Sequence, residues 1–164
     1  MKLFSTCTIG AVKLQNRVVM SPMTRSRATN NLPNSLMVSY YNQRSGAGLI
    51  ITEGTSPSPN GLGYARIPGA FSAEQTAGWK QIAEAAHRGG AGIFMQLMHC
   101  GRVGSTLNLP AGAELVAPSA VALGGKIWTD SQGEQPYDQP REMTLKDIEL
   151  AIAEYAQSDR KSVV

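Results

Sequence analysis

Polar residues that could bind a ligand follow three short apolar segments of the chain. Residues 21–25, 52–55 and 96–102 come directly after the apolar segments 18–20, 49–51 and 93–95. Together they offer hydroxyl groups, a carboxamide, an imidazole and backbone N–H groups, but few acidic side chains. Such a set suits a planar ligand that carries several carbonyl and ring-nitrogen atoms.

The three apolar segments predict β-strands. Their apolar runs are continuous rather than alternating, as in strands that are buried on both faces of a parallel sheet. Glycine-containing turns directly precede the second and third segments. The carboxyl ends of parallel strands lie at one edge of a sheet, so the polar residues that follow them are expected to converge there. Gln96, at the end of an apolar strand, is expected to be a buried carboxamide that needs partners.

Helical patterns separate and follow the strands. Ser72 and Gln75 have the spacing of a capping box at the start of an amphipathic helix. A weaker pattern covers about 34–44, and a further helix is predicted to start at Thr144. The apolar face of that last helix consists of Leu145, Ile148, Ile152 and Tyr155.

The alternation of strands and helices indicates an α/β fold with a parallel sheet. A dinucleotide-binding fold should show G-x-G-x-x-G after a strand, but Gly61-Leu62-Gly63 is followed by Arg66 at the third position. We therefore favour a partial TIM (β/α)8 barrel made of about the first three βα units.

Two hairpins are expected beside the barrel strands. The first dozen residues, with Gly10-Ala11 in a turn, predict an N-terminal hairpin. Residues 101–141 are too long for a plain connection and predict a functional loop that carries a hairpin insertion after the third strand. We place the turn of that insertion within 121–128, at Gly124-Gly125.

Composition excludes several classes of function. The 164 residues have a net charge of +3 with scattered basic side chains, so no nucleic acid partner is expected. Cys7 and Cys100 are far apart and no metal-ligand spacing exists, which favours free thiols and no metal site. No apolar run reaches the roughly 18 residues of a membrane span, and no signal peptide is evident. We expect a cytoplasmic protein without a membrane partner.

Several segments, in this order, resemble successive signatures of the Old Yellow Enzyme family of NAD(P)H:flavin oxidoreductases, which includes alkene reductases. They are residues 16–27 (NRVVMSPMTRSR), 48–54 (GLIITEG), 63–64 with 68–69, 96–102 (QLMHCGR), 117–119 and 140–144. The resemblance runs from about Leu3 to Gln157. It implies an eight-stranded barrel that binds FMN, with NAD(P)H as co-substrate. The implied reaction reduces activated C=C bonds of small electrophilic alkenes such as enones, or nitro compounds and nitrate esters, by hydride transfer through flavin N5.

The resemblance also assigns roles to residues of this chain. Thr24 would hydrogen-bond near flavin O4 and N5 and tune the flavin, and the Gly54 N–H would approach its pyrimidine edge. The Gln96 carboxamide would present an acceptor and a donor to flavin N3–H and O2. Tyr64 and Met98 would line the substrate pocket, Met98 at a position where many relatives carry Trp. The cofactor-binding set is Ser21, Pro22, Met23, Thr24, Gly54 and Gln96.

The resemblance implies further residues that this chain lacks. The substrate-anchoring pair, the proton-donating Tyr and the phosphate nest of the family belong to later strands, so no catalytic residue is assigned here. We interpret 1–157 as the N-terminal part of a single FMN-binding TIM-barrel domain and 158–164 as an atypical tail. The alternative is a non-catalytic truncated fragment, or a half-barrel complemented by a C-terminal half or by self-association. An aldolase-like barrel is weaker, because no Schiff-base Lys stands at a strand end.

Each candidate also has a purely structural interpretation. Thr24 could be a turn or cap residue, and Tyr64 could be surface packing. His99 is more consistent with a hydrogen-bonding group in a loop than with a base or metal ligand. Cys100 has no visible activator and is expected to be inert. Arg25 and Arg27 are either solvated or paired with acids across the barrel mouth.

Overall fold

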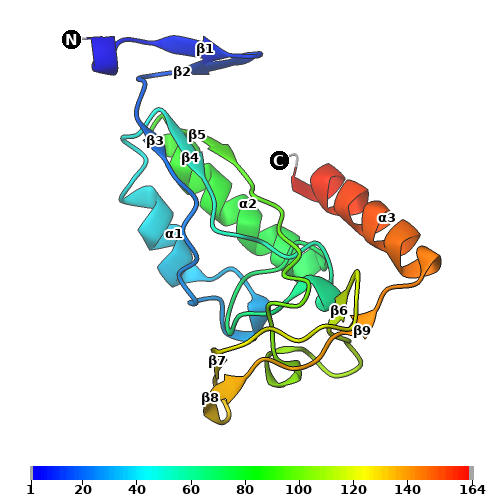
Figure 1. Ribbon diagram of the computed structural model, residues 1–164. Helices are drawn as coiled ribbons and strands as arrows, with labels where there is room; N and C mark the ends of the chain where they lie inside the picture. The colour runs from blue at the N-terminus through cyan, green and yellow to red at the C-terminus, as the bar shows by residue number, and fades with distance from the viewer. Residues whose placement is uncertain (1, 163–164) are drawn as a thin grey trace.

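A three-stranded parallel sheet forms the centre of the computed structural model, which describes residues 2–162. Strands β3 (Val19–Met20), β4 (Leu49–Ile51) and β5 (Gly92–Phe94) lie in the order β3-β4-β5. Met20 pairs with Ile50 and Ile50 with Ile93. The parallel sheet predicted from the three apolar segments is thereby confirmed (Figure 1).

Two helices cover one face of this sheet. Helix α1 (Ser35–Asn42) begins at Asn34, whose side chain accepts hydrogen bonds from two backbone N–H groups of the first turn. Helix α2 (Ala73–Arg88) begins with the predicted capping box, in which Ser72 and Gln75 each accept from the other's backbone N–H. These helices and the sheet share one core, made of Ala28, Met37, Tyr41, Ile50, Trp79, Ile82, Ala86 and Ala91.

The opposite face of the sheet is largely open. Val19 and Phe94 are 45% and 43% exposed, whereas Ile50 is completely buried against the helices. The expectation of burial on both faces was therefore wrong for β3 and β5, whereas in β4 both Leu49 and Ile50 are buried. A continuous apolar run reflects burial of a strand in the complete fold. In a closed barrel, this face of the sheet would be covered from the side of the remaining strands.

The predicted N-terminal hairpin is present. It pairs β1 (Cys7–Ile9) with β2 (Val12–Leu14) around Gly10, whose φ of +56° favours glycine. Leu14 is buried near Leu49 and Gly92, where it covers the amino end of the sheet interior. A 3-10 turn, η1 (Lys2–Phe4), precedes the hairpin.

The hairpin insertion after β5 exists, but its turn was misplaced. Strand β7 (Lys126–Thr129) pairs with β8 (Gly133–Pro136), so the turn lies at 130–132 rather than at Gly124-Gly125. The Thr129 hydroxyl closes this turn by accepting from the Gln132 N–H and donating to the Gly133 carbonyl. Gly133 has a φ of +68°, a backbone conformation that favours glycine. It therefore has the role in the turn that was predicted for Gly124-Gly125.

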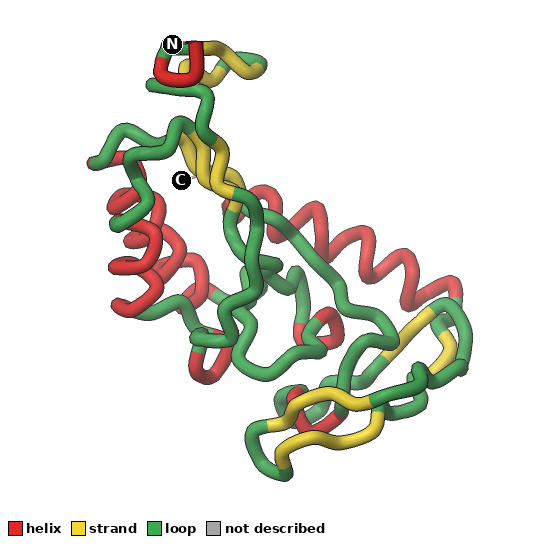
Figure 2. The backbone as a smooth tube through the Cα atoms, turned by 60° about the vertical axis from the view of Figure 1, so that its left-hand side comes forward, coloured by secondary structure: helices red, strands yellow, loops and turns green. Residues whose placement is uncertain are grey.

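Shorter elements complete the insertion and its surroundings. Strand β6 (Val116–Ala117) pairs in parallel with β9 (Arg141–Glu142). Three 3-10 turns, η2 (Thr29–Asn31), η3 (Pro59–Gly61) and η4 (Thr106–Asn108), lie in the connections. Figure 2 shows the two hairpins at opposite ends of the molecule, with the parallel sheet between them.

Helix α3 (Leu145–Ser162) starts where predicted but does not bury its apolar face. Leu145 and Ile152 are 80% and 66% exposed, so that part of the prediction was wrong. Polar contacts hold the helix instead: the buried Ser158 hydroxyl lies 3.1 Å from the Pro57 carbonyl oxygen and 3.3 Å from that of Ala70. The helix crosses residue 157 without a break, and the division into 1–157 and 158–164 stays a prediction.

Candidate functional site

The polar segments that follow β4 and β5 stay joined beyond the strands. The Thr52 hydroxyl accepts from the Gln96 N–H at 3.1 Å, and the Gln96 carbonyl accepts from the Thr55 N–H at 2.9 Å. The Thr55 carbonyl in turn accepts from the Met98 N–H at 2.9 Å. Backbone pairing therefore fixes the Gln96–Met98 stretch beside Gly54, as the strand order predicted.

Gly54 and Met98 are direct neighbours. A Cβ added at Gly54 would lie 2.5 Å from Met98 Cε and 2.7 Å from its Sδ, which is closer than real contacts allow. Glycine at position 54 thus leaves room for the Met98 side chain. Gly54 is buried, and its N–H donates no hydrogen bond to any residue within 2–162.

The loop after β3 presents its side chains outward. Ser21, Met23 and Thr24 are exposed and Pro22 is half-buried. Gln96 is exposed as well, so the expected buried carboxamide was wrong. Across the part of the chain that is described, the polar side-chain groups of Ser21, Thr24 and Gln96 have no protein partner. They are free donors and acceptors at the carboxyl ends of neighbouring strands.

Tyr64, His99 and Cys100 lie close together beside this rim. Tyr64 is 37% exposed, and a Cβ added at the preceding Gly63 would lie 2.6 Å from the Cys100 Cβ. Burial raises the pKa of the Cys100 thiol to about 11, which agrees with its expected inertness. Both cysteines are free, as predicted.

His99 acts as a hydrogen-bonding group, as expected from its loop position. Its Nδ1 accepts from the Gly101 N–H at 3.0 Å, and burial lowers the pKa of the imidazole. Its backbone N–H donates to the Tyr155 hydroxyl of α3 at 2.9 Å. Among residues 2–162 no group of His, Cys, Asp or Glu side chains is arranged to hold a metal ion.

Sequence reasoning missed Glu53. This side chain is only 1% exposed, although it stands directly between Thr52 and Gly54 at the rim. Its Oε2 accepts from the Arg25 N–H at 3.3 Å, and its Oε1 accepts from the Tyr41 hydroxyl at 3.2 Å. Burial raises the pKa of the Glu53 carboxyl, and burial and the nearby carboxylate raise that of Tyr41 well above its usual range. A lone acid inside an apolar strand end was the signal that could have revealed it.

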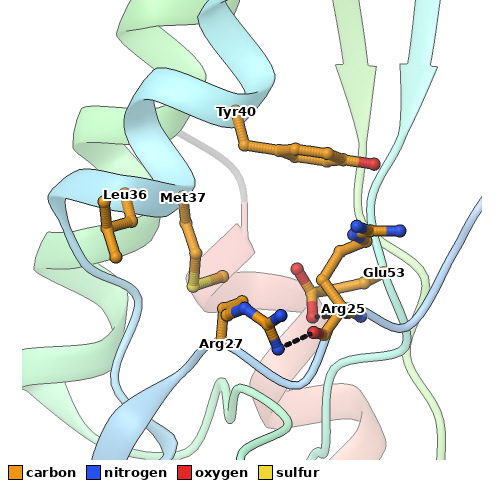
Figure 3. Close-up of a pocket in the computed structure, with 6 residues that line it drawn as sticks. All are labelled: Arg25, Arg27, Leu36, Met37, Tyr40 and Glu53. Carbon is orange, nitrogen blue, oxygen red and sulfur yellow. Dashed lines mark hydrogen bonds between the residues drawn. The ribbon is translucent and has the colours of Figure 1, made fainter.

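Glu53 forms one wall of a pocket of about 230 Å³ between the loop after β3 and helix α1 (Figure 3). The Arg25 guanidinium lies 5.3 Å from the centre of the Tyr40 ring. The Arg27 guanidinium donates to the carbonyls of Arg25 and Ser26. Neither arginine side chain forms an ion pair with an acid within residues 2–162, and both residues are exposed, so of the two alternatives solvation is the one found there.

A family comparison identifies the chain. Residues 2–164 match the family described as NADH:flavin oxidoreductase / NADH oxidase. The chain belongs to this family. Members include flavin oxidoreductase hxnT of Emericella nidulans, which is 37% identical over 98% of this chain and 42% of its own length. 12-oxophytodienoate reductase 7 of Oryza sativa subsp. japonica is 34% identical over 95% of this chain and 40% of its own length.

A solved family structure supports the same assignment. The Old Yellow Enzyme homologue of Zymomonas mobilis superposes with a TM-score of 0.92 at 38% identity, over 99% of this chain and 45% of that protein. The resemblance to Old Yellow Enzymes is thereby confirmed, and the chain adopts part of their α/β barrel. It spans less than half the length of these relatives.

Proposed function

We propose that this chain supplies the flavin-binding rim of an FMN-dependent oxidoreductase that reduces activated C=C bonds. One observation carries the proposal. The chain belongs to a flavin oxidoreductase family, and within residues 2–162 the Thr24 hydroxyl, the Gly54 N–H and the Gln96 carboxamide have no hydrogen-bond partner. All three stand at the carboxyl ends of adjacent parallel strands. Such a rim is where barrel enzymes bind their ligands.

The residues fit the hydrogen-bonding edge of a flavin. Thr24 would donate from its hydroxyl toward O4 and N5, and Gln96 would offer one donor and one acceptor to O2 and N3–H. The Gly54 N–H, which is buried and has no partner within the described residues 2–162, would gain one from the pyrimidine edge. Ser21, Pro22 and Met23 would lie along the ring, whereas Tyr64 and Met98 would shape the pocket for a substrate.

Substrate and co-substrate follow from the same proposal. When bound, FMN would take a hydride from NAD(P)H and deliver it to an electrophilic alkene such as an enone, or to a nitro compound or nitrate ester. The rice relative is named for reduction of 12-oxophytodienoate, which supports a small oxo-compound as substrate. This chain's part would be to orient the ring and to form one wall of the pocket.

A second candidate role is that of a half-barrel without turnover of its own. The exposed inner side chains Val19 and Phe94 favour it, because a closed barrel would bury them. We propose that a C-terminal half-barrel covers this face, since the chain matches only 42% of hxnT. Association of two copies of this chain is the competing outcome.

Mixing the purified chain with FMN, NAD(P)H and cyclohexenone tests the enzyme proposal. Bound flavin together with loss of NAD(P)H absorbance that depends on cyclohexenone is expected when a family C-terminal half is supplied. Absence of both bound flavin and turnover under that condition would overturn it. Turnover by the monomeric chain alone would refute the half-barrel role.

A further inference from the structure

We propose that Glu53 is a positioning residue that sets the spacing between the two segments expected to bind the flavin. It joins the loop after β3 to the segment after β4 through its side chain, whereas the backbone pairing already joins the segments after β4 and β5. This inference rests on the proposed flavin-binding function.

The chain order makes the link direct. Thr24 immediately precedes Arg25, whose N–H donates to Glu53 Oε2, and Gly54 immediately follows Glu53. A shift of the carboxylate would therefore move the Thr24 hydroxyl relative to the Gly54 N–H. Both are candidates for the same edge of one rigid ring, so their separation matters for binding.

Helix α1 anchors the other side of the carboxylate. Tyr41 is fully buried, donates from its hydroxyl to Glu53 Oε1 and accepts from the Glu53 N–H at 2.9 Å. Its ring packs edge-on against Tyr40 at 5.1 Å and near Trp79 at 6.2 Å between ring centres. Tyr41 therefore fixes one oxygen of Glu53. The other oxygen, Oε2, accepts from the Arg25 N–H of the loop after β3 (Figure 3).

A purely structural explanation of Glu53 is weak. The side chain is buried, and it forms no ion pair with any residue in the described range 2–162. Burying a carboxylate in this way opposes folding, and an apolar side chain of similar size would fill the space more favourably. A polar side chain of this length is needed here, because the Arg25 N–H and the Tyr41 hydroxyl come from separate elements and must be held at a fixed distance.

Two substitutions distinguish the length of the Glu53 side chain from its charge. Glu53→Gln keeps the length of the side chain and an oxygen for the Arg25 N–H but removes the charge. Glu53→Asp keeps the charge but withdraws the oxygens by one methylene. The same two changes at Glu84, an exposed residue of α2, serve as matched controls. Amide hydrogen exchange at Arg25 is measured without cofactor, and FMN affinity is measured separately by flavin fluorescence.

The proposal expects Glu53→Asp to speed exchange at Arg25 by about ten- to a hundredfold, as loss of a hydrogen bond to a charged acceptor would. FMN binding should weaken by about tenfold in the same variant. Glu53→Gln should stay within about threefold of the parent in both measurements. Unchanged Arg25 exchange in Glu53→Asp, or a larger effect of Gln than of Asp, overturns the proposal. If the parent binds no FMN, the proposed function fails while the exchange data still decide the role of Glu53.

Discussion

At the scale of single residues, two glycines near the sheet meet very different neighbours. A Cβ at Gly48 would lie 2.0 Å from the Asn16 carbonyl oxygen, which is part of the backbone. A Cβ at Gly54 would come closest to Met98 Cε and Sδ, which form the flexible end of a side chain. Backbone cannot withdraw from a clash as a long side chain can, so the two positions should respond differently to alanine.

We expect Gly48→Ala to lower the free energy of unfolding by about 3 kcal/mol and Gly54→Ala by under about 1 kcal/mol. Urea unfolding followed by Trp fluorescence measures both. In a Met98→Ala background, Gly54→Ala should have no further effect, because the contact that it disturbs is gone. Equal losses of unfolding free energy for the two glycine variants would contradict the expectation that the Met98 side chain moves aside.

The ionisation of Glu53 gives a prediction with a definite sign. Burial raises the pKa of its carboxyl above the ordinary value of 4.5, so the native state holds this proton more tightly than the unfolded state. The resulting stability is fully present below pH 4.5 and is lost as the pH rises through the native pKa. As the pH is lowered from about 7, the unfolding free energy of the parent should rise relative to that of Glu53→Gln. A difference that is flat, or that shifts the other way, contradicts the assignment.

At the scale of elements, what could be predicted depended on how local the determinants were. The capping box at Ser72 and the turn at Gly10 depend on a few neighbouring residues, and both were predicted. The turn at 130–132 was missed because Thr129 closes it with a side chain, a feature less visible than Gly124-Gly125. The exposure of Gln96 and the hydrogen bonds of Glu53 depend on residues from other elements, such as Tyr41. No local sequence pattern predicts such contacts.

The capping box provides a test at this scale. Ser72→Ala removes the acceptor for the Gln75 N–H, which is 3.1 Å away, and should lower the unfolding free energy by about 1 kcal/mol. Ser39→Ala on the exposed side of α1 is the control and should leave stability within about 0.5 kcal/mol. Thermal and urea unfolding should agree on this order. If Ser39→Ala lowered the unfolding free energy as much as Ser72→Ala, the stabilising role of the capping box would be contradicted.

At the scale of the whole molecule, the main feature is the uneven covering of the sheet. One face packs against α1 and α2, while Val19 and Phe94 on the other face stay exposed, as does most of the apolar side of α3. Exposed apolar surface of this kind favours association. No helix within residues 2–162 is long and apolar enough to span a bilayer.

The chain by itself should therefore associate with further copies at micromolar concentration. Replacing Val19 and Phe94 by Thr should reduce that association, as measured by sedimentation velocity. The double variant should keep its core, because neither side chain belongs to the buried cluster around Trp79 and Ile82. Association that persists unchanged would place the contact surface elsewhere than on the inner face of the sheet.

Titration with FMN tests the central claim most directly, with bound flavin detected by its changed visible spectrum. The parent chain, combined with a family C-terminal half, should bind FMN at one site. Gln96→Leu, which keeps the size but removes both hydrogen-bonding groups, should weaken binding about tenfold or more, whereas Gln81→Leu on the exposed side of α2 should not change it. Failure of the parent to bind FMN, or equal affinity of Gln96→Leu and the parent, would contradict the account.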